Sequence, residues 1–113
     1  MKRLPALFVL AGLIAAPAFA LAATYDNVPV VDVNCSRKAA ANPDAHTRDC
    51  ALKCAASGFG IVTSDQHFIK FDAAGNAKIV DQLKASGKTD HLRVNVTGDV
   101  KGDTLQVKTV KLL

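Results

Sequence analysis

The chain contains three cysteines, and all of them lie near one histidine in the sequence. Cys35 is followed by His46, Cys50 and Cys54, and the last three are spaced four residues apart. Thiolate sulfur and imidazole nitrogen are common ligands of zinc, and sulfur also suits the soft ion copper(I). We therefore expect Cys35, His46, Cys50 and Cys54 to form a metal site for zinc or copper.

A disulfide bond is the alternative use of these cysteines. Cys35 paired with Cys54 or Cys50 would close a loop of roughly 15 to 20 residues and stabilise the fold by about 3 kcal/mol in the chain-entropy model. A Cys50–Cys54 bond is not expected, because in a helix both Cβ atoms lean towards the N-terminus. The C-x3-C spacing also differs from the C-x-x-C motif of thiol–disulfide enzymes. The sequence leaves both the metal site and a disulfide of Cys35 open.

One helix is predicted to carry three of these four side chains. Asn42 is a good N-cap, the proline after it suits the first helical position, and Gly58 is a natural stop. Alanine-rich sequence between them favours continued helix. The histidine and the two later cysteines would then form one row at i, i+4 spacing. The fourth residue, Cys35, follows directly after a predicted strand.

The rest of the chain alternates short strands and turns. Val-rich and alternating segments predict strands, Pro29 indicates an edge or a bulge, and a phase shift near Lys108 or Thr109 indicates a second bulge. Asn76 is expected to cap a short helix over 77–86. The predicted strands cover 25–33, 59–63, 67–71, 91–97 and 104–112.

This order predicts a mainly β (α+β) fold. Five short strands with a helix between the third and fourth is the order of an OB-type barrel, here with an additional helix inserted between strands one and two. A plain antiparallel sheet would give similar spacing. We favour the small five-stranded barrel, because closure removes edges that so small a sheet cannot otherwise protect.

The N-terminus has the features of an export signal. Lys2 and Arg3 precede an apolar run over 7–16, and Ala20-Leu21-Ala22 is a small-x-small cleavage site. We expect a signal peptide over 1–22, with cleavage after Ala20 as the second choice, and a single OB-like domain over 23–113. The apolar run is too short to span a membrane. The expected location is periplasmic or secreted, with no membrane span after cleavage.

Charge and composition argue against several functions. Removing Lys2 and Arg3 from the 14 basic residues leaves 12 against 10 acidic ones, a net charge of +2. Only four aromatic residues follow the signal, whereas nucleic-acid binding needs a positive groove and stacking aromatics. His67 and His91 are isolated, and no nucleophile–base pair is visible. We expect no nucleic-acid partner and no enzymatic activity; a protein or metal partner remains unknown.

Taken together, the segments VVDVNC, HTRDCALKC, GFGIV and GDVKGDTLQVKTV resemble a group of small exported bacterial proteins with an OB-like core, most of them without an assigned activity. The resemblance covers essentially the whole chain after the signal. Its most specific part is the Cys…His-x3-Cys-x3-Cys spacing. It implies a fold and an exported location, and it implies no reaction.

Overall fold

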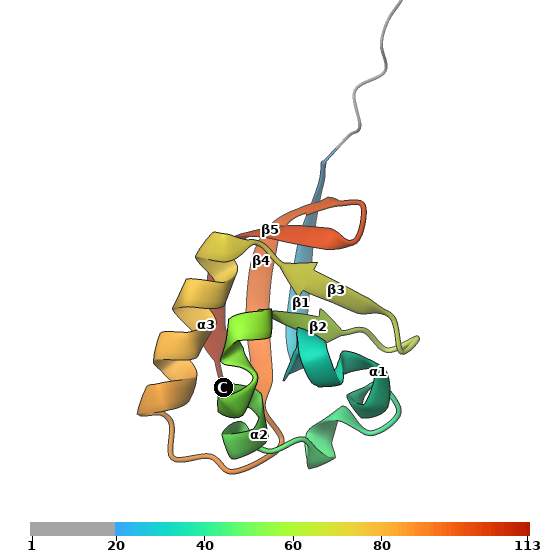
Figure 1. The fold of residues 1–113 in the computed structure, drawn as a ribbon. Coiled ribbons are helices and arrows are strands. Elements are labelled where there is room, and N and C mark those ends of the chain that lie inside the picture. Colours follow the sequence, from blue (N-terminus) through green and yellow to red (C-terminus); the bar gives the residue numbers. More distant parts are fainter. Residues whose placement is uncertain (1–19) are drawn as a thin grey trace, which may run out of the picture.

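The computed structural model describes residues 20–113, so most of the predicted signal peptide lies outside the described part. Five strands form a barrel with helices at its lower end and along one side (Figure 1). The strands are β1 (Leu21–Asp32), β2 (Phe59–Val62), β3 (Phe68–Phe71), β4 (Arg93–Lys101) and β5 (Thr104–Leu112). The helices are α1 (Ser36–Ala39), α2 (Arg48–Lys53) and α3 (Ala73–Ala85), with 3-10 turns η1 (Val33–Cys35), η2 (Pro43–Ala45) and η3 (Ala55–Ser57).

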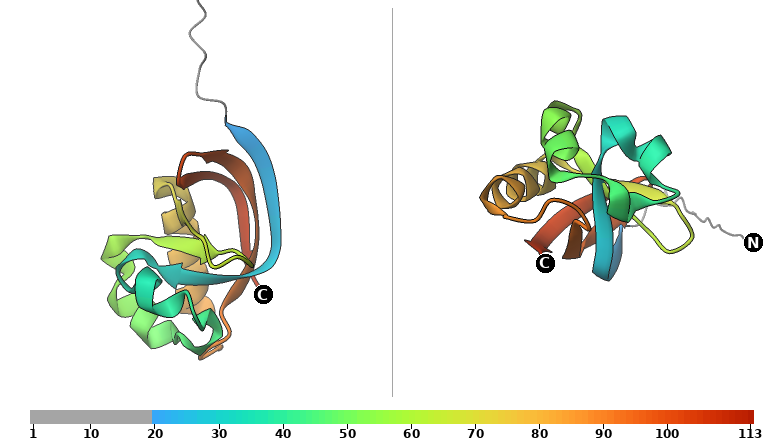
Figure 2. Two further views of the ribbon diagram at one scale, coloured as in Figure 1. Left: turned by 90° about the vertical axis from the view of Figure 1, so that its right-hand side faces the viewer. Right: turned by 90° about the horizontal axis from the view of Figure 1, so that it is seen from below.

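The strand order is β1-β2-β3-β5-β4, and β4 pairs again with β1 to close the barrel. All neighbours are antiparallel except β3 and β5, which run parallel. The predicted mainly β, OB-like five-stranded barrel is therefore confirmed, and the alternative of an open antiparallel sheet is wrong. The three long strands, β1, β4 and β5, curve around the barrel (Figure 2).

The core fills the barrel and continues under α3. The alternating apolar residues of the strands point inwards, and Ile79 and Leu83 of α3 are fully buried against them. The helix begins at Ala73, four residues earlier than predicted, because Asp72 caps it by accepting a hydrogen bond from the Gly75 backbone N–H at 3.0 Å. Asn76, the expected cap, instead accepts a hydrogen bond from the backbone N–H of Phe59 at 2.8 Å.

Two bulges let the long strands bend. Thr97 pairs with Thr109 and Gly98 pairs with Val107, so Lys108 has no partner across the ladder, as the phase shift predicted. A second register shift lies between Tyr25 and Val28, immediately before Pro29. The extra residue of a bulge increases the local twist, which helps a five-stranded sheet to close.

The segment between β1 and β2 differs from the prediction of one helix over 42–58. Asn42 makes no side-chain cap, and a single 3-10 turn follows it before His46 becomes extended, with φ −72° and ψ 127°. Thr47 then starts a new helix, α2, by accepting a hydrogen bond from the Cys50 N–H. The histidine therefore lies outside the helix and shares no helical row with the two later cysteines. No helix in the part of the chain that is described is long and apolar enough to cross a membrane.

Candidate metal site

Asp32 lies at the centre of the candidate site. It is the last residue of β1 and is completely buried. One carboxylate oxygen, Oδ2, accepts a hydrogen bond from the Cys35 backbone N–H at 2.9 Å and so caps the η1 turn. This cap fixes Cys35 three residues after the strand end. A buried carboxylate requires such partners, because an unpaired buried charge is strongly destabilising.

His46 approaches the same carboxylate from the other side. Its Nε2 lies 2.6 Å from Oδ1 of Asp32, and its side chain is only 10% exposed. The η2 turn that precedes it is held by Arg93 of β4, whose guanidinium donates to both carboxylate oxygens of Asp44 at 3.0 and 2.9 Å. The backbone N–H of His91 also donates to the Asp44 carbonyl at 2.9 Å. The barrel wall therefore positions the segment that carries the imidazole.

Asp32, Cys35 and His46 form a possible metal-binding group. One ligand atom from each lies within 4.8 Å of the others, a spacing that a single ion could bridge. Carboxylate, thiolate and imidazole are all known ligands of zinc in proteins. The group combines three short segments, namely the end of β1, the η1 turn and the residue after η2.

Cys54 lies next to this group. It ends α2, and its sulfur accepts a hydrogen bond from the Asn34 side-chain amide at 3.5 Å. Its proximity also raises the pKa of the Cys35 thiol. Ser57 ties the two segments together, since its hydroxyl accepts from the Asn34 N–H at 3.1 Å and donates to the Cys54 carbonyl at 2.7 Å. A second sulfur is thus available beside the three-residue group.

Cys50 occupies a different position. It is exposed on α2 and lines a pocket of about 390 Å³ together with Cys35 and His46. Lys38 is a further lining residue of this pocket. Asp32 does not line it, so the pocket meets the outer side of the group whereas the carboxylate lies on the inner side.

The surroundings keep Cys35 protonated. Burial raises the pKa of the Cys35 thiol, and the Asp32 carboxylate and the Cys54 thiol raise it further. A nucleophilic cysteine needs the opposite, a pKa lowered by positive charge. A metal ion that bound there would have to displace the thiol proton.

The structure places the four predicted ligands in different positions. Cys35 and His46 come together, and Cys54 is adjacent to them. Cys50 lies outside the group and lines the same pocket as Cys35 and His46. All three cysteines are free, so neither disulfide of Cys35 is present in the structure. His67 and His91 are exposed, as expected.

Asp32, which lies within the strand predicted over 25–33, was not identified as a site residue from the sequence. The available signal was the spacing Asp-x-x-Cys at a strand end, the position at which a carboxylate caps a turn and faces a cysteine.

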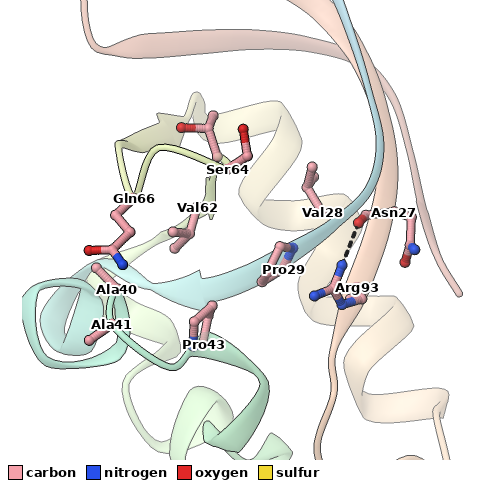
Figure 3. A pocket seen from close by; sticks show the side chains of 11 residues that line it. Asn27, Val28, Pro29, Ala40, Ala41, Pro43, Val62, Ser64, Gln66 and Arg93 are labelled. Atoms are coloured by element: carbon pink, nitrogen blue, oxygen red, sulfur yellow. Dashed lines mark hydrogen bonds between the residues drawn. The ribbon is translucent and has the colours of Figure 1, made fainter.

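A second pocket, of about 320 Å³, lies on the other side of the α1–η2 segment (Figure 3). Its wall includes Arg93, whose Nη1 donates to the Asn27 carbonyl at 2.6 Å. This bond and the two to Asp44 use three of the five N–H donors of the guanidinium. Asn27 and Gln66, both in its lining, have positive φ angles of 53° and 65°.

Comparisons with protein-family models, with curated proteins and with solved structures found no match to this chain. The resemblance to the exported OB-like group thus rests on the sequence pattern, and the barrel fold rests on the structure described above.

Proposed function

We propose that this protein is an exported, non-enzymatic domain that binds one soft or borderline metal ion between Asp32, Cys35 and His46, with Cys54 as the fourth ligand. The observation that carries the proposal is the convergence of three ligand atoms within 4.8 Å around a fully buried carboxylate. A tetrahedral ion filled by four protein ligands has no open position, which suits carriage, storage or stabilisation rather than catalysis.

Charge balance favours zinc over copper(I). A divalent ion with one carboxylate, two thiolates and a neutral imidazole has a net charge of −1, whereas copper(I) with the same ligands would have −2. Buried net charge is costly, so the divalent ion fits better. The hard carboxylate oxygen of Asp32 is also a better ligand for zinc than for copper(I).

Elemental analysis together with thiol counting tests the proposal. The protein, recovered from the periplasm of a bacterial host, should contain one zinc per chain and three titratable thiols after denaturation. Asp32→Asn, Cys35→Ser and His46→Ala should each lower the zinc affinity by at least about 10–100-fold, the loss usual even for a residue that only supports a metal ligand. The matched control is Cys50→Ser, which removes a thiol outside the group and should leave the affinity unchanged. Equal metal loss in all four variants, or no metal in the parent, would contradict the proposal.

A structural or interaction module closed by a Cys35–Cys54 disulfide is the second candidate. Cys54, unlike Cys50, lies near enough to raise the pKa of the Cys35 thiol, which supports it as the partner. The bond would close a loop of about 20 residues and stabilise the domain by about 3 kcal/mol. One free thiol, no bound metal and a large loss of thermal stability on reduction would select this candidate. Cys50 would then be the thiol that remains free.

A further inference from the structure

The candidate site has an inner and an outer side. Asp32 is fully buried, and Cys54 is held against the η1 turn by the Asn34 amide. Cys35 and His46, by contrast, line the 390 Å³ pocket as well as the buried group. An ion that approached from solvent would therefore meet the pocket first and reach Asp32 last.

Cys50 is the thiol placed at the outer side of this path. It is exposed, it lines the same pocket as Cys35 and His46, and it lies outside the compact three-residue group. Its backbone N–H donates a hydrogen bond to the Thr47 hydroxyl at 3.2 Å. Within residues 20–113 its sulfur has no hydrogen-bond partner. The thiol is thus positioned by its helix and free to take a ligand.

The charge at the pocket indicates the kind of donor. Lys38 lines the pocket and is exposed, and the remaining lining residues apart from Cys35, His46 and Cys50 are alanines and Asn42. A single positive charge at the mouth favours an approaching anion over a cation. Zinc held by low-molecular-weight thiolates is such an anion, whereas the free hydrated ion is a cation.

We propose that Cys50 is the entry ligand of the site: it takes zinc from an anionic metal–thiolate complex at the pocket mouth and passes it to Cys35 and His46. This proposal rests on the metal-binding function proposed above. The Cys50 thiol gives its proton to water as its sulfur binds zinc, and one donor thiolate leaves. The Cys35 thiol then gives up its proton as its sulfur replaces that of Cys50, which is reprotonated. His46, Asp32 and Cys54 displace the remaining donor thiolates, and the Cys54 thiol gives up its proton to one of them. Zinc stays divalent throughout, and no electrons are transferred.

Transfer kinetics and equilibrium affinity test this role separately. Zinc would be supplied as its glutathione complex, and binding followed by stopped-flow through a competing chromophoric chelator. Cys50→Ser should slow transfer by about tenfold while the equilibrium zinc affinity stays at the parent value, because thiolate is the efficient entering ligand. Lys38→Glu should slow transfer from the anionic glutathione complex and speed the capture of hydrated zinc, because reversing the charge at the pocket mouth repels an anion and attracts a cation.

The control for Lys38→Glu is Lys53→Glu. Lys53 is an exposed lysine of α2, the helix that carries Cys50, and it does not line the pocket, so the change should affect neither transfer rate. Parent-like transfer by Cys50→Ser would overturn the entry role, although the metal site itself would stand. A large loss of equilibrium affinity in Cys50→Ser would also overturn it, since Cys50 would then be a resident ligand. If the metal site itself did not exist, the parent protein would bind no zinc, a result distinct from either outcome for Cys50→Ser.

Discussion

At the scale of single residues, Asp32 is the side chain on which the candidate site depends. It caps the turn that carries Cys35 and contacts His46 through its second oxygen. Asp32→Asn keeps the size and a capping oxygen but removes the charge, so the fold should persist while zinc affinity falls by at least about 10–100-fold, the loss usual even for a residue that only supports a metal ligand. Competition titration against a chromophoric chelator measures this change. Asp103→Asn, at an exposed turn, is the control and should bind as the parent does.

The Cys35 thiol predicts the pH dependence of metal binding. Because burial and the Asp32 carboxylate raise its pKa, the thiol is protonated throughout the neutral range, and an ion must release its proton. Zinc affinity should therefore rise with pH, by about tenfold per pH unit for each thiol proton released. Isothermal titration between pH 6 and 8 gives the slope. Cys35→Ser should reduce that slope, and an unchanged slope would exclude Cys35 as a ligand.

At the scale of elements, the strands could be predicted and the segment between β1 and β2 could not. Each strand buries one face, so apolar and polar residues alternate along its own sequence. Even the bulge at the unpaired Lys108 is visible as a shift in the apolar positions of β5. The stretch over 42–58 instead offers two competing helix starts, Asn42 and Thr47, and the bonds that decide between them come from elsewhere. Asp44 is held by β4, and the Arg48 N–H donates to the Thr89 carbonyl at 2.8 Å.

The same reason explains why Asp32 was missed as a partner of His46. The two residues are fourteen positions apart, and they meet only because η2 ends where it does and the chain turns back over β1. Sequence spacing identified Cys35 and His46 as candidates. It could not show which additional oxygen ligand the fold would bring to them.

The Arg93–Asp44 ion pair that holds η2 in place predicts how stability depends on pH. Hydrogen bonds from Arg93 lower the pKa of the Asp44 carboxyl. A lowered pKa means that the pair stabilises the fold above the usual carboxyl range, near pH 4, and that this contribution is lost as pH falls through the folded-state pKa. Asp44→Asn should lower the free energy of unfolding by about 1 kcal/mol at pH 7 and by less at pH 3, which lies below the usual carboxyl pKa.

Urea unfolding at both pH values measures this difference. Asp49→Asn is the matched control, because the Asp49 carboxylate is 88% exposed and lies 3.9 Å from its arginine neighbour. It should unfold as the parent does at both pH values. If Asp44→Asn destabilised the protein equally at pH 3 and pH 7, the ion pair would not be the cause.

At the scale of the whole molecule, the site depends on barrel closure, since β1 carries Asp32 at one end and pairs with both β2 and β4. Within this barrel β4 and β5 form a hairpin, and the two strands lie close together at the Lys108 bulge. There Gly98 pairs with Val107, and a Cβ atom on Gly98 would collide with the backbone carbonyl oxygen of Gln106. Backbone cannot move aside as a flexible side chain can, so the strands would have to separate.

Gly98→Ala should therefore destabilise the domain by about 1–3 kcal/mol, the usual range for overpacking, without touching any metal ligand. Gly87→Ala is the control, because nothing lies within 4 Å of a Cβ atom there and the loss of glycine flexibility in the unfolded chain is mildly stabilising. Thermal unfolding of both variants with and without zinc separates the stability of the barrel from the stabilisation by bound metal. The ion should raise the melting temperature of each variant, because binding to the folded state alone adds stability. A Gly98→Ala protein as stable as the parent would show that the β4–β5 contact is not tight, and that the barrel can close with more space at its bulge.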